Sequence, residues 1–452
     1  MQFTFSVVPN SGLAAIVNCY RQLDASQWWT PDSMRQWQFT QLARLVEHAR
    51  LHVPFYADAL KGLRADSTGA IDEDAWRSLP ILTKEQVRAD PGAFRARQLS
   101  PGTNVFSQWG TGSTGVPIEV VTTLPQWHLF HAAKLRLLQW HDCNPQGKLC
   151  EILPFSQLRP ENPVQRLPQW EGPVGALLKT GEVVRMKLFC DLPAQVAFLE
   201  AEKPEYLLTF PSNLQLLLRA FRRAEKRLPS LRMVRTLSEC VDPHLWTECR
   251  EVLGVPLVDT YGAKECGYLG VQCPEHDHYH VQSEFSLVEV LAPDGSLCGP
   301  GQTGRVVVTP LHALAMPLLR YELGDLAEVG EPCACGRGLP VLSRIHGRQR
   351  DMLTLPSGRK ISGSILLGQR TFASMPVVAQ FQIVQKNRLE LEVRIVADRP
   401  LEKAESQQIV QRLTAQIGSD FEIRVVEVDH IPRLPGGKSR DFVSEIASAG
   451  AE

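Results

Sequence analysis

The strongest constraint on the fold is an alternation of short apolar runs with helical segments through the middle of the chain. Between residues 205 and 262, the runs EYLLTF, LRMVRTL and VPLVDTYG have the length and composition of strands. A helical pattern, NLQLLLRAFRRAEKRL, separates the first run from the second. Strands that alternate with helices predict an α/β fold with a largely parallel sheet.

The pattern changes twice further along the chain. After residue 280 it becomes β-rich, with FSLVEVL and GRVVVTP joined through the turn signals PDGS and PGQTG. From near residue 350, two strands around Asn387, a helix and a further strand predict a compact α+β unit. We therefore predict a large N-terminal domain, residues 1–347, and a small C-terminal domain, residues 348–452, with the boundary near Gly347–Asp351.

Charge and hydropathy exclude several classes of protein. The formal net charge of −1 does not favour nucleic acid or an anionic membrane as a partner. The sequence has no apolar stretch of about 18 residues and no basic N-terminal region, so neither a membrane span nor a secretory signal is expected. Most of the eleven cysteines are scattered singly, which suits a reducing compartment, and we predict a cytoplasmic protein. The sequence leaves a homodimer open.

The segment QWGTGSTGVP is rich in glycine and hydroxyl groups and is typical of a phosphate-binding loop. It partly matches the dinucleotide fingerprint, but the strand-like IEVVTT follows where that fingerprint needs a helix. It also matches the glycine spacing of a Walker loop, but Val116 and Pro117 stand where lysine and a hydroxyl residue are needed. A kinase glycine loop is excluded by the absence of HRD and DFG. By itself, this segment is equally compatible with a flexible connector.

Four further segments, in order along the chain, give the glycine-rich segment a context. They are VDTYGAKECG, RYELGDLAEV, GRQRDMLTLPSGRKI and IPRLPGGKSRDF. Together with TGSTGVP, they resemble the core motifs of the adenylate-forming superfamily. The closest resemblance is to the phenylacetate–CoA ligase branch and its CapK-like relatives, whose opening helix is similar to LARLVEHARLHVPFY. The resemblance covers nearly the whole chain.

The resemblance implies a fold and an activity. The fold would be a large adenylate-forming domain with parallel sheets and a β-rich subdomain, followed by a small mobile α+β domain. The activity would be an ATP-dependent, AMP-forming ligation: a carboxylic acid, expected to be aromatic, is activated as an acyl-adenylate and transferred to CoA as a thioester. Such chemistry needs positioning and charge stabilisation rather than an enzyme nucleophile. Transfer to an amine or to a carrier-protein thiol is the alternative, and a non-catalytic nucleotide-binding protein is a third possibility.

The resemblance also assigns roles to individual residues. The residues expected to hold the ATP phosphates are Thr111, Gly112, Ser113, Thr114 and Gly115. The residues expected to bind the adenosine part of ATP or AMP are Ser238, Glu239, Asp259, Thr260, Tyr261, Gly262, Asp325 and Arg348. Glu265 would bind the Mg²⁺ that bridges phosphate oxygens. Lys438 would contact both the α-phosphate and the substrate carboxylate. Candidates for the substrate pocket are Phe210, Pro211 and Ser212.

The sequence departs from the family pattern at three places. Ser238 stands where relatives usually have a smaller residue, often glycine or alanine. Arg350 stands where the family's hinge residue is usually aspartate and sometimes lysine, although Asp351 is retained. After Gly358 the sequence reads RKISGSILLG, unlike the relatives, in a segment that would border the thiol tunnel. This last departure keeps the acceptor open.

Cysteines and histidines form a separate candidate metal site. Cys273 is followed by three histidines in CPEHDHYHV, and Cys333 and Cys335 stand together in CACG. Three cysteines and one histidine are a known ligand set for structural Zn²⁺. In the resemblance, His280 aligns best with the histidine ligand of zinc-containing relatives. His276, in Cys-Pro-x-His spacing, is the alternative, and buried thiols with solvent-exposed histidines would explain the same pattern without a metal.

Overall fold

The computed structural model describes residues 3, 5, 9–110, 118–348, 352–358, 360–362, 369–372, 375, 377–434 and 436–446. The predicted phosphate-binding residues Thr111, Gly112, Ser113, Thr114 and Gly115 lie outside the described residues, as do Arg350 and Asp351.

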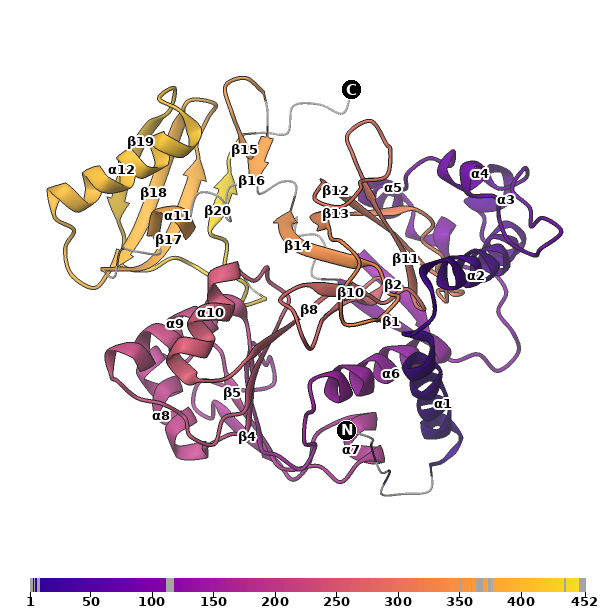
Figure 1. The fold of residues 1–452 in the computed structure, drawn as a ribbon, viewed down its shortest axis with the longest axis horizontal. Helices are drawn as coiled ribbons and strands as arrows, with labels where there is room; N and C mark the ends of the chain where they lie inside the picture. Colours follow the sequence, from indigo (N-terminus) through magenta and orange to yellow (C-terminus); the bar gives the residue numbers. More distant parts are fainter. Residues whose placement is uncertain are drawn as a thin grey trace.

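One sheet of twelve strands organises the large part of the chain, in the order β11-β12-β13-β14-β10-β9-β8-β7-β6-β3-β5-β4 (Figure 1). Its parallel strands are β5 (Val183–Lys187), β3 (Leu149–Leu153), β6 (Tyr206–Thr209), β7 (Met233–Leu237) and β8 (Leu257–Ala263). The antiparallel strand β4 (Val164–Leu167) forms one edge. This parallel region confirms the predicted α/β fold.

The β-rich region after residue 280 continues the same sheet. Its strands are β9 (Gly267–Gln272), β10 (Tyr279–Val281), β11 (Ser286–Leu291), β12 (Thr303–Pro310), β13 (Tyr321–Val329) and β14 (Val341–Arg348). Each pairs antiparallel with its neighbours, and β9 joins them to β8. The predicted antiparallel strands are therefore present, but hydrogen bonds across β8 and β9 connect them to the parallel strands.

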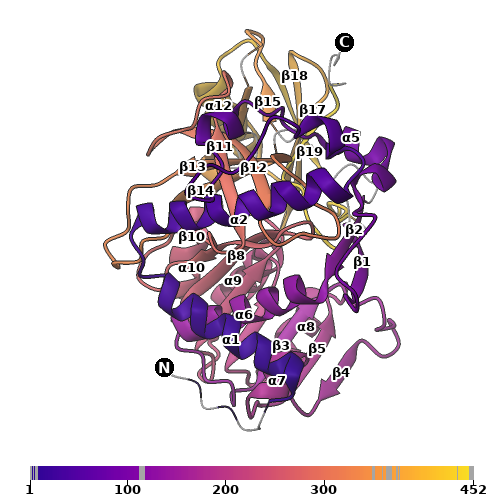
Figure 2. The ribbon, with the colours of Figure 1, turned by 90° about the vertical axis from the view of Figure 1, so that its right-hand side faces the viewer.

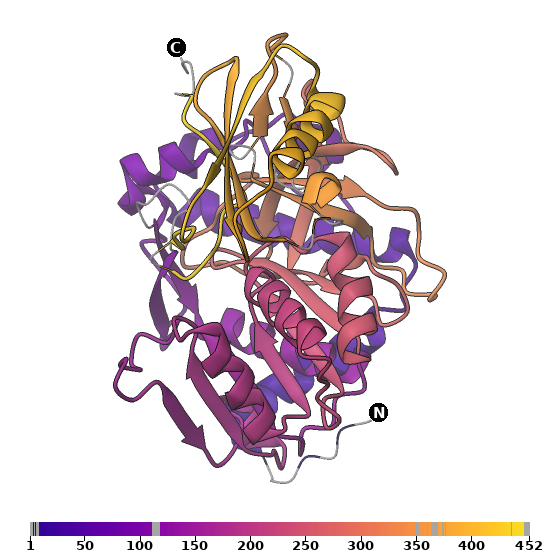
Figure 3. The ribbon, with the colours of Figure 1, turned by 90° about the vertical axis from the view of Figure 1, so that its left-hand side faces the viewer.

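Two groups of helices cover opposite faces of the parallel strands. Helices α1 (Ser11–Ser26), α6 (Leu124–Trp140) and α7 (Pro173–Leu177) lie on one side (Figure 2). Helices α8 (Leu192–Glu202), α9 (Pro211–Arg223) and α10 (Pro243–Leu253) lie on the other (Figure 3). Adjacent residues of a strand point to opposite faces. Leu207 of β6 accordingly belongs to the core cluster beneath α9 and α10, and Leu208 to the cluster beneath α6.

The glycine-rich segment is flanked by two strands, and the second of them contains the predicted strand IEVVTT. Strands β1 (Val105–Gly110) and β2 (Ile118–Thr123) pair antiparallel, and Gly110 is the register partner of Ile118. Helix α6 begins directly after β2, where the Thr123 side chain accepts a hydrogen bond from the backbone N–H of Gln126. The remaining helices of the N-terminal part are α2 (Pro31–His52), α3 (Tyr56–Ala59), α4 (Glu73–Arg77), α5 (Lys84–Ala89) and the 3-10 helix Pro91–Phe94.

A small domain with its own core follows the large sheet. Its four-stranded sheet has the order β19 (Glu422–Glu427), β18 (Glu390–Ala397), β17 (Val378–Gln385) and β20 (Phe442–Ser444). Helix α12 (Lys403–Ile417) packs on this sheet, while α11 (Gln369–Phe372) and the hairpin of β15 (Met352–Thr354) and β16 (Lys360–Ser362) complete the unit. The predicted strand–strand–helix–strand order is present.

The small domain lies above α9 and α10 (Figure 1), and the Asp398 carboxylate forms ion pairs with Arg219 and Arg223 of α9. The division at residues 347 and 348 stays a prediction, because residues 349–351 are not described. No helix among the described residues combines the length and apolar character needed to cross a membrane.

Candidate active site

The carboxyl ends of β7 and β8 bring two of the predicted motifs together. Thr236 pairs with Asp259 and Leu237 with Thr260, so the segment after β7 lies beside the end of β8. Ligands of open α/β sheets bind outside the carboxyl ends of the strands. Ser238, the first residue after β7, has a φ of +72°. This left-handed conformation is costly for a residue with a side chain and is found most often where a site requires it.

Asp259 is held in a buried hydrogen-bond network. Its Oδ1 accepts a hydrogen bond from the Thr236 hydroxyl at 2.7 Å and its Oδ2 accepts one from the Tyr279 hydroxyl at 2.8 Å. The backbone N–H of Asp259 donates to Gln272 Oε1 at 2.8 Å. Burial raises the pKa of Asp259 to about 6, although the hydrogen bonds from Thr236 and Tyr279 oppose this shift. The position of the carboxylate is therefore fixed from two sides.

Asp325 is oriented by two other predicted site residues. The Tyr261 hydroxyl donates to Asp325 Oδ2 at 2.9 Å, and Arg348 Nε lies 2.9 Å from Asp325 Oδ1. Arg348 is the register partner of Asp325 on the neighbouring strand, and its Nη1 donates to the Leu323 carbonyl at 2.6 Å. Each carboxylate oxygen has two lone pairs, so both oxygens can still accept a hydrogen bond from a ligand hydroxyl.

The residue after Tyr261 in the sequence, Gly262, packs closely against the backbone of β9. A Cβ atom at Gly262 would lie only 2.5 Å from the carbonyl oxygen of Gly267, so a larger residue would separate β8 from β9. The side chain of Glu265, in the turn between these strands, is buried. The Lys264 ammonium donates to the Trp109 carbonyl at 2.7 Å. This bond connects the end of β8 to the strand from which the glycine-rich segment departs.

The loop that carries Lys438 lies on the carboxyl end of the sheet. Gly437 has a φ of +79°, and a Cβ atom there would lie 2.8 Å from Leu188 Cδ2 and 3.1 Å from Pro154 Cβ. Glycine is therefore required both by conformation and by close approach. Burial, and then the Arg348 guanidinium, lowers the pKa of the Lys438 ammonium, while Glu239 and Asp325 act in the opposite direction. Glu239, Asp325 and Arg348, which are far from Lys438 in the sequence, are thus close enough to act on its charge.

Glu239 connects this loop to the large domain. Its Oε2 accepts a hydrogen bond from the backbone N–H of Ser212 at 2.9 Å, in the first turn of α9, where helical N–H groups lack partners. Its Oε1 accepts one from the backbone N–H of Ser439 at 2.6 Å. Arg433 Nη1 donates to Ser212 Oγ at 2.8 Å and to the Gly437 carbonyl at 2.9 Å. Sequence reasoning missed Arg433 and Ser439 as positioning residues, although both stand within the quoted segment IPRLPGGKSRDF.

An acidic side chain is buried at the same junction. Burial raises the pKa of the Asp441 carboxyl to about 7; the charges of Glu239 and Asp242 raise it further, and Arg433 opposes them. Asp242 is the N-cap of α10, and burial raises its pKa to about 6. Acidic groups of both domains are therefore close enough to affect one another's ionisation.

The predicted pocket residues Phe210, Pro211 and Ser212 begin α9. Phe210 and Pro211 are buried, and Phe210 is part of the core cluster beneath α9 and α10. Ser212 instead faces the junction, where it contacts Glu239 and Arg433.

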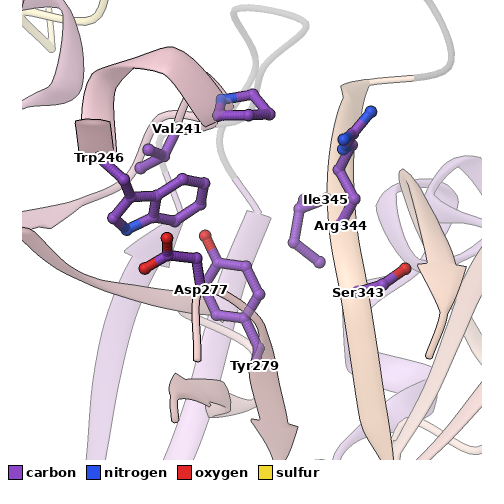
Figure 4. A pocket seen from close by; sticks show the side chains of 8 residues that line it. Val241, Trp246, Asp277, Tyr279, Ser343, Arg344 and Ile345 are labelled. Atoms are coloured by element: carbon purple, nitrogen blue, oxygen red, sulfur yellow. The ribbon is translucent and has the colours of Figure 1, made fainter. Parts of the chain in front are cut away.

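A small pocket of about 110 Å³ lies beside the Asp259 network (Figure 4). Its lining residues are Val241, Pro243, Trp246, Asp277, Tyr279, Ser343, Arg344 and Ile345. Tyr279 separates the pocket from Asp259, to which its hydroxyl donates. None of the lining residues is a predicted site residue, so we locate the candidate site from the hydrogen-bonded cluster rather than from this pocket.

The predicted cysteine and histidine ligands do meet in space. The ligand atoms of Cys273, His280, Cys333 and Cys335 all lie within 4.8 Å of one another. Zinc bound tetrahedrally at about 2.3 Å to sulfur and about 2.0 Å to nitrogen separates its ligand atoms by roughly 3.5–3.8 Å. The Cys273 and Cys333 sulfurs are 3.8 Å apart, and the Cys335 sulfur lies 3.3 Å from His280 Nε2. The donor set and its spacing therefore fit zinc.

Both candidate histidines lie at the cluster. His276 Nδ1 lies 3.4 Å from the Cys333 sulfur and 3.6 Å from the Cys273 sulfur, and belongs to a second group with His278. His280 is fully buried, and its Nδ1 lies 3.4 Å from the Leu339 carbonyl oxygen. Such a contact on the far ring nitrogen is how metal-binding histidines are commonly oriented. The group that combines all three cysteines with one histidine contains His280.

Comparisons with known proteins agree with this arrangement. Residues 34–312 match the family model described as AMP-binding enzyme, and residues 353–445 match the CapK C-terminal domain. A phenylacetate-coenzyme A ligase of Thermus thermophilus is 26% identical over 443 residues, which cover 90% of this chain and 96% of that protein. A second, from Aromatoleum evansii, is 25% identical and covers 72% of each chain.

A solved structure shows the same fold. The crystal structure of a 2-hydroxyisobutyryl-CoA ligase in the postadenylation state, in complex with 2-HIB-AMP, has a TM-score of 0.71 at 19% identity. The match covers 99% of this chain and 95% of that one. Since the AMP-binding model alone matches more than half of the residues, the chain belongs to the family of AMP-binding enzymes.

Proposed function

We propose that this protein is an ATP-dependent, AMP-forming ligase that activates a carboxylic acid as its acyl-adenylate and then transfers the acyl group to CoA. The observation that carries the proposal is the meeting of Lys438, from the small domain, with Asp325 and Arg348 at the carboxyl end of the large sheet. An aromatic acid is part of the proposal. The name of the curated relatives, phenylacetate-coenzyme A ligase, supports it.

In the first half-reaction, a carboxylate oxygen of the acid attacks the α-phosphorus of ATP and pyrophosphate leaves. The residues proposed to bind adenosine are the set around Asp259, Tyr261 and Asp325. Asp325 accepts hydrogen bonds from the ribose hydroxyls, which its fixed orientation between Tyr261 and Arg348 favours. Lys438 stabilises the negative charge that moves between the carboxylate and the phosphate. Each contact acts by positioning and electrostatics, which suits a reaction with an activated phosphate.

The residues present also fit a magnesium ion. Magnesium in nucleotide sites is bound through one or two carboxylates together with phosphate oxygens. Glu265 is a buried carboxylate that follows Lys264, whose ammonium donates to the Trp109 carbonyl. Its negative charge is among those that raise the pKa of Arg348 against the effect of burial. The bound ion would neutralise phosphate charge and so favour departure of pyrophosphate.

In the second half-reaction, the sulfur of CoA attacks the acyl carbonyl and AMP leaves. We propose that the small domain rotates between the two steps, so that Lys438 withdraws from the site. Transfer to an amine or a carrier-protein thiol would use the same adenylate and differs only in the acceptor. The sequence after Gly358 departs from the pattern that the resemblance implies, which is why the acceptor is tested separately below.

We also propose a structural zinc ion bound by Cys273, His280, Cys333 and Cys335, with His276 as the alternative histidine. Four protein ligands would close the site to substrate, which is typical of a structural rather than a catalytic zinc. The zinc would tie the segment before β10 to the turn between β13 and β14.

The experiment measures ATP–pyrophosphate exchange with a panel of aryl and alkyl acids, followed by product analysis with CoA, amines or carrier protein added. The proposal expects acid-dependent exchange and a thioester with CoA. Absence of exchange with every acid would contradict adenylation, and exchange without any thioester would contradict CoA as the acceptor.

A further inference from the structure

Charged side chains form a row on the sheet face beneath α6. Arg185 of β5 pairs with Glu151 of β3, Glu151 pairs with Leu208 of β6, and Leu208 pairs with Arg235 of β7. Paired residues on parallel strands point to the same face. Leu208 belongs to the core cluster beneath α6, so Arg185, Glu151 and Arg235 face that helix too. Charges are rarely placed on such a face unless they are paired.

The row contains more cations than anions. Arg185 forms ion pairs with both nearby carboxylates: its Nε lies 2.8 Å from Glu151 Oε2, and its Nη2 lies 2.6 Å from Glu171 Oε2. Lys134 of α6 lies near enough to the row for the charges of Arg235, Glu151 and Arg185 to act on its ammonium. Burial, and then the positive charge of Arg235, lowers the pKa of the Lys134 ammonium. Three cations therefore face two carboxylates.

Neither the Lys134 ammonium nor the Arg235 guanidinium forms a hydrogen bond or ion pair with any described residue. The Lys134 ammonium lies 5.9 Å from the centroid of the Phe130 ring. Both side chains are partly buried, and a positive charge that has lost part of its water without gaining an anion costs free energy unless a ligand supplies the negative group.

A second group nearby also lacks a partner. His131, one turn before Lys134 on α6, is 8% exposed, and its Nδ1 atom is buried with no hydrogen bond in the described part of the chain. Its ring contacts Trp127, with centroids 4.1 Å apart. Burial, followed by the charges of Lys134 and His128, lowers the pKa of His131 to about 3, so the imidazole is neutral and Nδ1 can donate or accept. Buried polar atoms without partners are rare in native structures and call for an explanation.

The cluster adjoins the proposed nucleotide site. Phe130 stacks on Tyr268 of β9 with ring centroids 4.8 Å apart and planes 5° apart. A Cβ atom at Gly267 would lie 3.5 Å from Phe130, and Gly267 itself packs against Gly262. The aromatic pair thus connects the end of β8 to Lys134, and Figure 2 shows α6 crossing this part of the sheet.

We propose that the acid activated by this protein carries a second carboxylate, which binds to Lys134 and Arg235 beneath α6 while the first reacts at the nucleotide site. Phe130 and Tyr268 line the path between the two carboxylates and favour a flat or aromatic connecting group. His131 supplies a further hydrogen bond at Nδ1. This inference rests on the proposed function and narrows its substrate class from carboxylic acids in general to dicarboxylic acids.

The test compares acids that differ only in the second carboxylate: terephthalate with benzoate, and adipate with hexanoate. We expect kcat/KM for pyrophosphate exchange to favour at least one diacid over its matched monoacid by about tenfold or more, the scale of one charge-assisted hydrogen bond. Lys134→Gln and Arg235→Gln should each remove most of this preference, and Lys134→Arg should restore part of it. The matched control is Lys179→Gln, a change at an exposed lysine after α7, which should leave the preference as in the wild type.

Two outcomes separate this inference from the proposed function. Exchange with monoacids as fast as with diacids would overturn the inference and leave the ligase activity standing. If no acid supports exchange, titration calorimetry with terephthalate and benzoate alone still tests the cation pair. Tighter binding of terephthalate that is lost in Lys134→Gln would support the inference, and equal binding of the two acids would overturn it.

Discussion

The backbone N–H of Ser439 donates a hydrogen bond of 2.6 Å to Glu239 Oε1. The other oxygen of the same carboxylate accepts a hydrogen bond from the first turn of α9. One side chain therefore joins the large domain to the residue that follows Lys438. Because the loop around Lys438 belongs to the small domain, this contact stabilises the arrangement in which that loop lies on the carboxyl end of the large sheet.

We expect Glu239→Gln to slow adenylation. The substitution removes the negative charge and keeps only one acceptor oxygen. The other oxygen becomes an NH₂ group, a donor that faces the donor N–H of the backbone. Hydrogen bonds to charged groups contribute about 1.5–3 kcal/mol, which corresponds to roughly 10–100-fold in pyrophosphate exchange. Glu251→Gln, at an exposed position of α10, is the control. Exchange at the wild-type rate in Glu239→Gln would mean that the contact has no role in adenylation.

We expect Lys438→Ala to separate the two half-reactions. Loss of a group that stabilises developing charge typically costs about 10²–10³-fold, so exchange should fall by that factor. Thioester formation from a synthetic acyl-adenylate and CoA should continue, because the lysine is not needed there. Lys403→Ala, at an exposed lysine that begins α12, provides the comparison. An equal loss in both half-reactions would contradict the proposed withdrawal of Lys438.

We expect purified protein to contain about one zinc ion per chain. Cys333→Ser and His280→Ala should lose the metal and unfold at a lower temperature, whereas His276→Ala should retain it. Cys298→Ser changes a cysteine outside the cluster and should not alter the metal content. Retention of zinc in His280→Ala together with its loss in His276→Ala would assign the fourth ligand to His276. Wild-type protein without zinc would contradict the site.

We expect the stability of the protein to depend on Asp441 between about pH 4 and pH 7. Its pKa is raised to about 7 in the folded protein from an ordinary value near 4, so in this range the folded state holds a proton that the unfolded state has released. The free energy of unfolding therefore falls as pH rises through this window. Asp441→Asn should remove this contribution and raise Tm at pH 8, by roughly 2–4 °C for each kcal/mol gained.

Thermal unfolding of Asp441→Asn and of the control Asp429→Asn, an exposed position on the same segment, measures this effect from pH 4 to 8. A Tm difference from the wild type that does not change with pH would show that the ionisation of Asp441 is not coupled to folding.

Local sequence patterns determined much of the secondary structure of this protein and several of its candidate site residues. The strand after the glycine-rich segment, the α/β alternation and the strand–strand–helix–strand unit near the C-terminus follow from hydrophobic periodicity and turn residues, which act over a few neighbouring positions. The motifs with Tyr261, Asp325 and Lys438 could be recognised for the same reason, because each is a short run with fixed spacing. The cluster of cysteines and histidines could be anticipated as a set of residue types, since cysteine and histidine are few and chemically distinctive.

Contacts between distant segments could only be decided by the tertiary structure. The β-rich region is joined to the parallel strands through β8 and β9, and backbone pairing of this kind leaves no local sequence signal. The role of Glu239 depends on Ser439, 200 residues away, and the histidine that joins the three cysteines depends on how β10 pairs with β14. The excess of positive charge beneath α6 is also invisible in the sequence, because Lys134, Glu151, Arg185 and Arg235 belong to four separate elements. The physical reason is common to all: side-chain partners are fixed by packing in three dimensions, whereas sequence patterns report only on neighbours along the chain.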